Sequence, residues 1–136
     1  MAKAIGTTDA VTTCDCCGKS NLKLTVAMQL DDGEVVHYGR TCAARNTGKT
    51  APQINSEIKA EAARVLAAAR AEYLASPEYI AERARFAARD EYARTHGVRM
   101  VGGVAMEFVK DACAAADVAR AAIATKFGLN AYQVMA

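Results

Sequence analysis

The feature that most constrains this chain is a pair of cysteines near its N-terminus, separated by two residues. Cys14 and Cys17 enclose Asp15 and Cys16, and Gly18 follows directly. This is the form of a zinc knuckle, in which a tight turn lets two thiolates bind one ion and a glycine adopts the positive φ that the turn needs. The sequence therefore predicts Cys14 and Cys17 as metal ligands, with Cys16 pointing away from the metal as a spare thiol.

A β-hairpin is predicted after the knuckle. From Leu22 to Leu30 apolar residues occupy every second position, which is the period of a strand with one buried face. Residues 31–33 (DDG) have turn chemistry. The following segment, 34–38 (EVVHY), is rich in β-branched and aromatic residues, so it predicts the returning strand.

A short helix is predicted over residues 41–46, because Gly39 breaks the second strand and Gly48 is suited to end a helix. Cys42 then lies in the first helical turn, where the helix dipole favours a thiolate. Knuckle, hairpin and helix in this order are the arrangement of a treble-clef zinc finger. Cys42 is therefore the third predicted ligand.

The fourth ligand stays open at this level. Structural zinc is normally four-coordinate, and the usual position, three residues before Cys42, holds Gly39. His37 is the best candidate, since neutral imidazole is a standard zinc donor. Asp15, Cys16 or a water molecule are the alternatives.

The turn of the hairpin decides where His37 points. A two-residue turn at Asp32 and Gly33 pairs Met28 with His37 and puts the imidazole on the face of the alternating apolar residues. A three-residue turn with Gly33 in the left-handed region pairs Met28 with Val36, and His37 then faces the other way. Both registers are compatible with the sequence.

These residues resemble a known group of proteins. The segments 14–19 (CDCCGK) and 37–45 (HYGRTCAAR), joined by an alternating strand, are similar to small cysteine-knuckle proteins of actinobacteria and their phages. In those proteins the segments read CxxCG(K/R) and YGxxCAAR. The resemblance covers residues 11–50 and implies a zinc-binding domain of mostly unassigned function. The high Ala and Arg content fits a GC-rich genome of that kind.

Overall charge does not select a partner. The chain has 136 residues, of which 24% are charged and 52% hydrophobic, as in ordinary folded proteins. Its net charge of +2 is far below the basic excess of many nucleic-acid binders. Basic residues nevertheless gather in and after the knuckle and after the second strand. The candidates for contacts with phosphates or an acidic protein are Lys19, Lys23, Arg40, Arg45 and Lys49.

The sequence favours a cytoplasmic protein without a membrane partner. The N-terminus lacks the apolar core of a signal peptide, and no run approaches the roughly 20 apolar residues of a membrane span. The cysteines number five, and their CxxC spacing in a reducing compartment favours a metal over disulfides.

Alanine-rich helices are predicted for the rest of the chain. A break over residues 50–54 ends the module, and three helices follow, from Asn55 or Ser56 to Ala75, from Pro77 to Thr95 and from Val104 to Phe127. Ser76, Gly97 and Gly128 serve as caps, and residues 98–103 connect the last two helices. Residues 129–135 (LNAYQVM) form a short final turn that either closes the bundle or meets a partner.

The predicted helix faces follow from apolar spacing. The first helix has a stripe of Ile58, Val65, Leu66, Ala69 and Tyr73. The second has a small-residue seam of Ile80, Ala84, Ala87 and Ala88 with Phe86 beside it, and the last has Phe108, Cys113, Ala116, Ala119 and Ile123. Glu82 with Arg85 and Asp90 with Arg94 are predicted surface ion pairs. A bundle with so few large side chains buries little apolar surface by itself, and a second copy of the chain would bury more, so a homodimer is a candidate assembly.

The predicted fold class is α+β, with a treble-clef-like zinc module at 1–50 and an alanine-rich bundle of about three helices at 51–136. The predicted function is a non-enzymatic interaction module with structural Zn2+, which contacts nucleic acid or an acidic protein through the basic helix after the hairpin. The alternative is a helical phage or mobile-element protein that modulates a host protein complex, with zinc purely structural. Catalysis is not expected, because neither an HxE nor an HExxH motif occurs.

Overall fold

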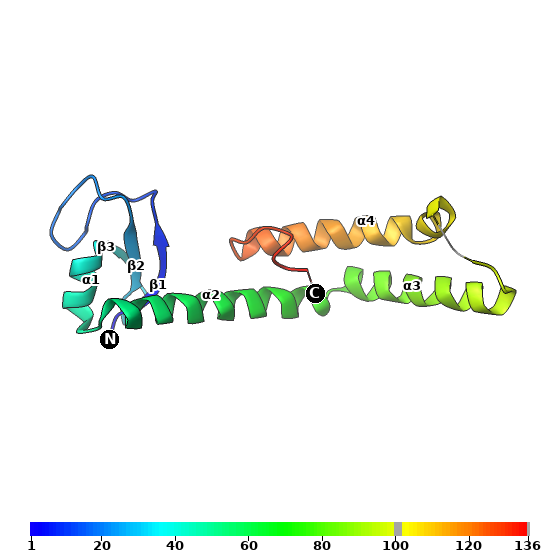
Figure 1. The fold of residues 1–136 in the computed structure, drawn as a ribbon, viewed down its shortest axis with the longest axis horizontal. Helices are drawn as coiled ribbons and strands as arrows, with labels where there is room; N and C mark the ends of the chain where they lie inside the picture. Colours follow the sequence, from blue (N-terminus) through cyan, green and yellow to red (C-terminus); the bar gives the residue numbers. More distant parts are fainter. Residues whose placement is uncertain (100–101, 136) are drawn as a thin grey trace. The chain divides into compact units, whose positions relative to one another are not determined.

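The computed structural model describes residues 1–99 and 102–135. In this part of the chain there are one three-stranded antiparallel sheet and four helices, so the fold is α+β (Figure 1). The chain forms two compact units, Met1–Arg64 and Val65–Ala136. The domain limits 1–50 and 51–136 stay a prediction. None of the helices among the described residues combines the length and the apolar character that crossing a membrane requires.

The sheet has the strand order β1-β2-β3. Strands β2 (Thr25–Gln29) and β3 (Val35–Tyr38) are the predicted hairpin, although β2 begins at Thr25 instead of Leu22. Strand β1 (Lys3–Thr8) was not predicted; it pairs antiparallel with β2 through a register shift between Ala4 and Gly6. A glycine and a register irregularity in so short a strand remove the period-2 pattern by which a strand is recognised.

The hairpin adopts the three-residue turn of the two registers left open by the sequence. Met28 pairs with Val36, the Leu30 N–H donates to the Glu34 carbonyl at 2.8 Å, and Gly33 has a φ of 89°. A glycine at this position is required because side chains rarely adopt a positive φ. His37 pairs with Ala27 and therefore lies on the opposite face of the sheet from Met28.

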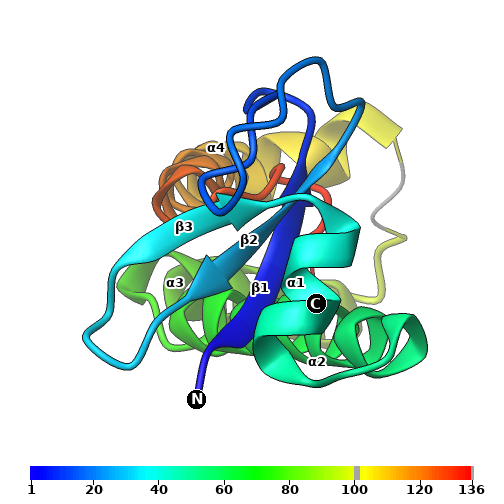
Figure 2. The ribbon, with the colours of Figure 1, turned by 90° about the vertical axis from the view of Figure 1, so that its left-hand side faces the viewer.

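The core of the first unit lies between one face of the sheet and two helices (Figure 2). Helix α1 (Arg40–Thr47) is the predicted short helix, and Gly48 ends it with a φ of 66°. Helix α2 (Ala51–Leu74) follows. The buried apolar residues come from β1, β2, α1 and the first turn of α2; they are Ala4, Val26, Met28, Ala43 and Ile54.

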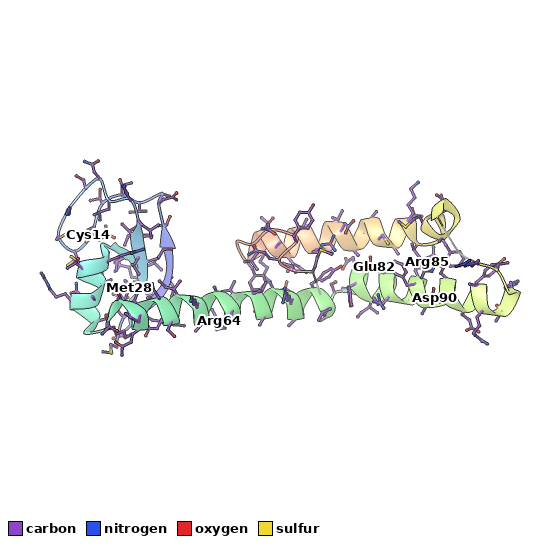
Figure 3. All side chains as sticks on the ribbon, in the orientation of Figure 1. Cys14, Met28, Arg64, Glu82, Arg85 and Asp90 are labelled. Atoms are coloured by element: carbon purple, nitrogen blue, oxygen red, sulfur yellow. The ribbon has the colours of Figure 1, made fainter. Side chains whose placement is uncertain are left out.

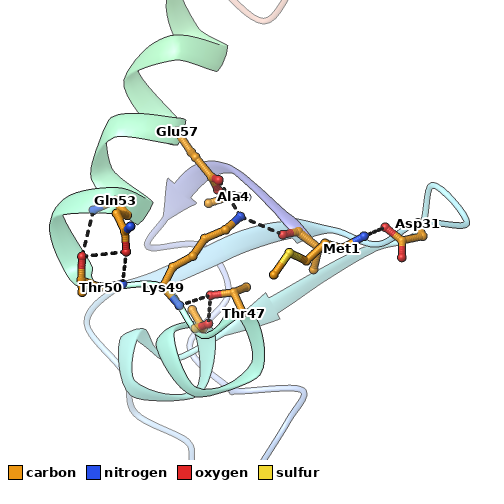
Figure 4. A network of polar contacts seen from close by, with 10 residues as sticks. Met1, Ala4, Asp31, Thr47, Lys49, Thr50, Gln53 and Glu57 are labelled. Atoms are coloured by element: carbon orange, nitrogen blue, oxygen red, sulfur yellow. Dashed lines mark hydrogen bonds and ion pairs between the residues drawn. The ribbon is translucent and has the colours of Figure 1, made fainter.

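The predicted break over residues 50–54 is wrong, because α2 begins at Ala51. Thr50 and Gln53 form a reciprocal cap: the Thr50 N–H donates to Gln53 Oε1 at 2.8 Å, and the Gln53 N–H approaches Thr50 Oγ1 at 3.5 Å (Figure 4). Pro52 fits the first turn because an N–H at that position would have no intrahelical partner. The Ala-Pro-Gln segment is thus a helix start and not a linker.

Two ion pairs attach β1 and the end of α1 to α2. Lys49 Nζ lies 2.5 Å from Glu57 Oε1 and donates to the Ala2 carbonyl at 3.3 Å, and the Ala4 N–H donates to Glu57 Oε2 at 3.2 Å (Figure 4). Further along α2, Glu61 accepts from Lys3 Nζ at 2.6 Å. Charged hydrogen bonds of this kind orient the helix over the edge of the sheet.

The second unit consists of the end of α2, α3 (Pro77–His96), α4 (Gly102–Lys126) and the C-terminal turn. The predicted caps are confirmed at Ser76, whose Oγ accepts the Tyr79 N–H, and at Gly97, which has a φ of 62°. Gly128 also has a positive φ after α4. The buried core residues of this unit are Ala69, Tyr73, Ala124 and Val134.

The C-terminal turn closes this unit. Val134 is completely buried against the core, whereas Tyr132 beside it is 83% exposed. The Gln133 carbonyl also accepts a hydrogen bond from Arg70 Nε at 3.1 Å. Of the two roles left open for residues 129–135, packing against the bundle is the one that the contacts of Val134 support.

The predicted seam of α3 is wrong. Ile80, Ala84, Ala87 and Ala88 are exposed, and Ile80 keeps 57% of its surface. Half-buried positions follow one face of α3 at spacings of three and four residues, and they hold four large side chains and one alanine: Tyr79, Glu82, Phe86, Arg89 and Ala93. The stems of Arg89 and Glu82 pack here while their charged ends bind Asp90 and Cys113, which a count of apolar residues does not reveal.

The predicted ion pairs of α3 are also replaced by others. In the described residues Arg89 pairs with Asp90 and Arg94 pairs with Glu91, each at 2.6 Å, instead of Glu82 with Arg85 and Asp90 with Arg94. Exposed ion pairs contribute little free energy, so exchanging one partner for another on the same helix costs little.

Helix α4 begins at Gly102, two residues before the predicted Val104. Residues 100 and 101 of the predicted connection lie outside the described residues. The predicted inner face is confirmed: Ala116 is buried, and Phe108, Cys113, Ala119 and Ile123 are half-buried. Burial, with a hydrogen bond to Glu82, raises the pKa of the Cys113 thiol, as expected for a cysteine that packs as a small apolar residue.

Candidate metal centre

The knuckle loop has the backbone geometry that the CxxC motif predicts. Gly18 has a φ of 70°, its N–H donates to the Cys14 carbonyl at 2.8 Å, and the Cys14 N–H donates to the Lys19 carbonyl at 2.9 Å. These two hydrogen bonds close the turn and hold the Cys14 and Cys17 thiols on one side of it. Cys14 is 1% exposed, whereas Cys17 is exposed.

The third thiol comes from the start of α1. Gly39 is the N-cap in an extended conformation, and its carbonyl accepts the Ala43 N–H at 2.9 Å. This places half-buried Cys42 in the first turn. The sulfur atoms of Cys14, Cys17 and Cys42 all lie within 4.8 Å of one another; we call these residues the cysteine cluster (Cys14 is labelled in Figure 3).

The cysteine cluster can hold a metal ion. Thiolates bound to one zinc ion at about 2.3 Å lie roughly 3.8 Å apart in tetrahedral geometry. The limit of 4.8 Å within which the three sulfurs lie exceeds this by about 1 Å, so side-chain adjustments of that size suffice to bring them onto one ion. The three ligands predicted from the sequence are therefore brought together by the fold.

The protons of the cysteine cluster are shared unequally. Burial raises the pKa of the Cys14 thiol, but backbone hydrogen bonds, that from Gly39 foremost, outweigh burial and lower the pKa to about 7. Hydrogen bonds with Cys17 and Cys14 raise the pKa of Cys42 to about 12. Without a metal, the Cys14 thiol thus ionises near neutral pH, while the neighbouring Cys42 thiol keeps its proton. A bound cation would take the place of that proton.

Cys16 lies beside the cysteine cluster. Its side chain is exposed, and its sulfur accepts a hydrogen bond from Asn46 Nδ2 at 3.2 Å. The same amide donates to the Cys42 carbonyl at 2.9 Å, one turn earlier on α1. Asn46 was not among the predicted site residues. The spacing of four residues between Cys42 and Asn46 was the available signal, since an Asn side chain can reach a carbonyl one turn back.

His37 and Asp15 contact each other. The Asp15 carboxylate accepts the His37 backbone N–H at 2.6 Å, and its oxygen lies 4.0 Å from His37 Nδ1. The Asp15 N–H in turn donates to the His37 carbonyl at 2.9 Å, which fastens the knuckle to the end of β3. Among the described residues the group of ligand atoms within 4.8 Å includes neither of them. The identity of the fourth ligand stays a prediction.

A cavity of about 680 Å3 opens onto the cysteine cluster. Its apolar wall is formed by Leu22 and Leu24, and Gly39 and Thr41 line it beside the start of α1. Four of the five predicted contact residues line the same cavity: Lys19, Lys23, Arg40 and Arg45. We call this cavity the basic cavity and these four residues the cavity cations.

Lys49, the fifth predicted contact residue, is not part of the basic cavity. Its amine is bound by Glu57 and by the Ala2 carbonyl, and its side chain is only 20% exposed. In the sequence no acidic residue lies among Arg40, Arg45 and Lys49, but the partner of Lys49 comes from α2. The pattern of charges near Lys49 in the sequence cannot reveal an ion-pair partner that comes from another helix.

No protein-family model matches the chain, and no curated protein or solved structure matches it either. The likeness to cysteine-knuckle proteins of actinobacteria and phages stays a prediction that rests on residues 11–50. The site itself offers three thiols within 4.8 Å of one another and four cationic side chains that line the same cavity.

Proposed function

We propose that this protein is a zinc-binding, non-enzymatic interaction module that contacts nucleic acid through the cavity cations. The observation that carries the proposal is that the cysteine cluster and four cationic side chains line one cavity. Thiolates are soft ligands that favour zinc among the abundant divalent ions, and zinc has no redox chemistry of its own. A zinc ion here would join the knuckle to α1.

The role of the ion would be structural. The core of the first unit contains two alanines among its five buried apolar residues, so hydrophobic burial contributes little stability per residue. Metal binding to three thiols drawn from two segments contributes directly to the free energy of folding. It would also fix the positions of the cavity cations, two of which lie on α1 and two in and after the knuckle.

Several features support phosphate as the group that is contacted. All four cavity cations are exposed, and none of them forms an ion pair within the described residues. No carboxylate lines the basic cavity in the same part of the chain. Clustered Lys and Arg side chains contact phosphates without reading sequence, and they release counterions when they do so.

The test is the salt dependence of binding. Zinc-loaded full-length protein is titrated into fluorescent oligonucleotides over a series of salt concentrations. The logarithm of the binding constant should fall linearly with that of the salt concentration, with a slope of about −3 to −4 for four phosphate contacts. Arg40→Ala or Lys23→Ala should each lower the magnitude of the slope by about 1. Lys59→Ala, an exposed lysine of α2 outside the cavity, is the matched control.

A second candidate is a helical interaction protein that modulates a host protein complex, with zinc purely structural, or that forms a homodimer. It is favoured by large apolar side chains that stay exposed in the second unit: Ile80, Met106, Val118 and Tyr132. Exposed apolar residues of this size are common at protein interfaces. Partner binding that is insensitive to salt, and that is lost in Val118→Asp but kept in Arg40→Ala, would favour this candidate over nucleic acid.

We propose that the module is not an enzyme. A catalytic zinc needs a nearby base, and neither a carboxylate nor an imidazole is among the described residues that line the basic cavity. His37 contacts Asp15, and His96 stacks on Tyr92 with ring centroids 4.0 Å apart. Hydrolysis of a nucleic acid or phosphoester by the zinc-loaded protein, abolished by Cys42→Ser, would contradict this.

A further inference from the structure

We propose that the metal of the cysteine cluster takes a phosphomonoester as its fourth ligand, with one phosphate oxygen on the metal and the cavity cations around the others. This inference rests on the proposed metal binding and adds a ligand class to it. The shared chemistry is a terminal phosphate, which either a free mononucleotide or the phosphorylated end of a nucleic-acid strand supplies.

The protein places a glycine where a fourth cysteine would close the metal site. Gly39 lies three residues before Cys42, and a Cβ built on it would be 4.0 Å from Cys14 Sγ and 3.3 Å from Leu22 Cδ1. A side chain at this position would therefore point into the space beside the cysteine cluster. With glycine there, the same space belongs to the basic cavity, which Gly39 lines.

The other candidate ligands from the protein do not line that space, although the Cys16 thiol hydrogen-bonds to the Cys42 thiol. Cys16, Asp15 and His37 are not among the described residues that line the basic cavity. The Cys16 sulfur is turned toward the Asn46 amide, and Asp15 and His37 contact each other. Because zinc bound by thiolates is almost always four-coordinate, the remaining donor would approach from the cavity.

The size of the cavity suits a small molecule or the end of a strand. A volume of about 680 Å3 lies within the range of roughly 300–1,000 Å3 that is usual for small-molecule sites. Leu22 and Leu24 give it an apolar wall. Sites of this type combine apolar walls with a few polar groups that fix one end of the ligand.

The charges around the cavity favour a dianion. A divalent metal with three thiolates carries one net negative charge, and the four cavity cations outnumber it by three. A phosphomonoester carries about −1.5 to −2 charges at pH 7, whereas a carboxylate or an internal phosphodiester carries only one. A monoester also offers three oxygens, so it can bind the metal and guanidinium groups together.

The experiment uses the full-length protein loaded with Co2+, whose visible absorption reports the atoms bound to the metal. Inorganic phosphate, adenosine 5′-monophosphate and a 5′-phosphorylated oligonucleotide are added in separate titrations. The expected result is a saturable change in the cobalt spectrum and selective broadening of the phosphorus resonance in NMR. The same oligonucleotide without its terminal phosphate should leave the cobalt spectrum unchanged. A response to the mononucleotide alone identifies the small-molecule source, and one to both identifies strand ends as well.

Two variants separate metal coordination from simple charge attraction. Gly39→Cys supplies a fourth thiol, so it should keep one metal per chain, show a spectrum typical of four sulfur ligands and lose the response to phosphate. Arg40→Ala should keep the metal and weaken the phosphate response about tenfold, as expected for the loss of one charge-assisted contact. Cys16→Ser should behave as the unmodified protein.

Three results would overturn the inference. The first is a cobalt spectrum that no phosphate probe changes while one metal remains bound per chain, in which case the proposed metal site stands alone. The second is an equal phosphate response in Gly39→Cys, which would place phosphate on the cations without a bond to the metal. The third is a change of the metal spectrum in Cys16→Ser without ligand, which would make Cys16 the fourth donor. Failure to bind any metal would instead overturn the proposed function.

Discussion

The backbone N–H of Gly39 donates a hydrogen bond to the sulfur of Cys14 across 3.2 Å. Gly39 is the N-cap of α1, and Cys14 begins the knuckle, so this contact joins the two segments that supply the cysteine cluster. A hydrogen bond of this kind stabilises the thiolate over the thiol, which contributes to the low pKa of Cys14. The metal-free protein therefore already stabilises the thiolate form of Cys14, which is the form that binds a cation.

The cysteine cluster should bind one metal ion per chain. Replacing any one of Cys14, Cys17 or Cys42 by serine should weaken zinc affinity by more than about 100-fold, because each supplies a bond to the ion. Cys113→Ser is the matched control, since that thiol lies on α4 in the other unit. Native mass spectrometry with and without a chelator measures the stoichiometry. Equal loss of zinc in Cys113→Ser would contradict the assignment.

Zinc affinity should rise with pH, because the metal-free cluster holds protons that the ion displaces. Because the pKa of Cys42 is about 12, zinc binding displaces at least the Cys42 proton at any pH near neutral. Because the pKa of Cys14 is about 7, zinc binding displaces a further proton, that of Cys14, below pH 7. Affinity should therefore change at least tenfold per pH unit above pH 7 and more steeply below. Competition with a chromophoric chelator between pH 6 and 8 measures this, and a flat profile would contradict it.

Glu61 should stabilise the first unit at neutral pH. Hydrogen bonds from Arg64 and Lys3 lower the pKa of Glu61 to about 2, against an ordinary 4.5. The stabilisation is thus complete above pH 4.5 and is lost as pH falls toward 2. Because both cations are largely exposed, Glu61→Gln should cost only about 1 kcal/mol of unfolding free energy at pH 7.

Urea denaturation at several pH values tests the role of Glu61. The difference between the unmodified protein and Glu61→Gln should shrink as the pH approaches 2. Asp90→Asn on α3 serves as the control, because that carboxylate is 67% exposed and its loss should change stability by less than about 0.5 kcal/mol. A difference for Glu61→Gln that grows on acidification would reverse the sign and refute the assignment.

Val134 should contribute to the stability of the second unit although it lies in a short turn, directly before Met135, the last described residue. Val134→Ala removes two buried methyl groups from a fully buried position and should cost about 2 kcal/mol. Tyr132→Ala, in the same turn but 83% exposed, should cost less than about 0.5 kcal/mol. Thermal unfolding monitored by circular dichroism measures both. Equal effects of the two substitutions would show that the turn does not pack on the core.

Local signals predicted the elements whose conformation depends on a few neighbouring residues. The knuckle follows from a glycine with positive φ at Gly18, and the limits of α1 and α3 follow from Gly48, Ser76 and Gly97. At α2 the local signal was present but was misinterpreted. Thr50 and Gln53 have the spacing of a capping box, and Pro52 between them lies in the first turn of the helix instead of marking a break.

Pairings between distant residues could not be predicted in the same way. Strand β1 is held by β2 and by the Glu57 carboxylate, and its own six residues show no alternation. The predicted seam of α3 was wrong because the partly buried positions hold Phe86, Glu82 and Arg89, and the polar ends of the last two bind Cys113 and Asp90.

The sequence by itself predicted the three thiols of the cysteine cluster, the hairpin, the limits of α1 and α3 and the basic character of the segment around the cluster, since spacing, turn chemistry and caps act within a few residues. Only the tertiary structure decided the hairpin register, the engagement of Lys49 by Glu57 and the meeting of the cavity cations over the cysteine cluster. The two-residue and three-residue hairpin turns have nearly equal local energy, but they bury different side chains of the sheet. The charge of Lys49 is neutralised by the helix that folds against it. These outcomes depend on contacts between segments far apart in the chain.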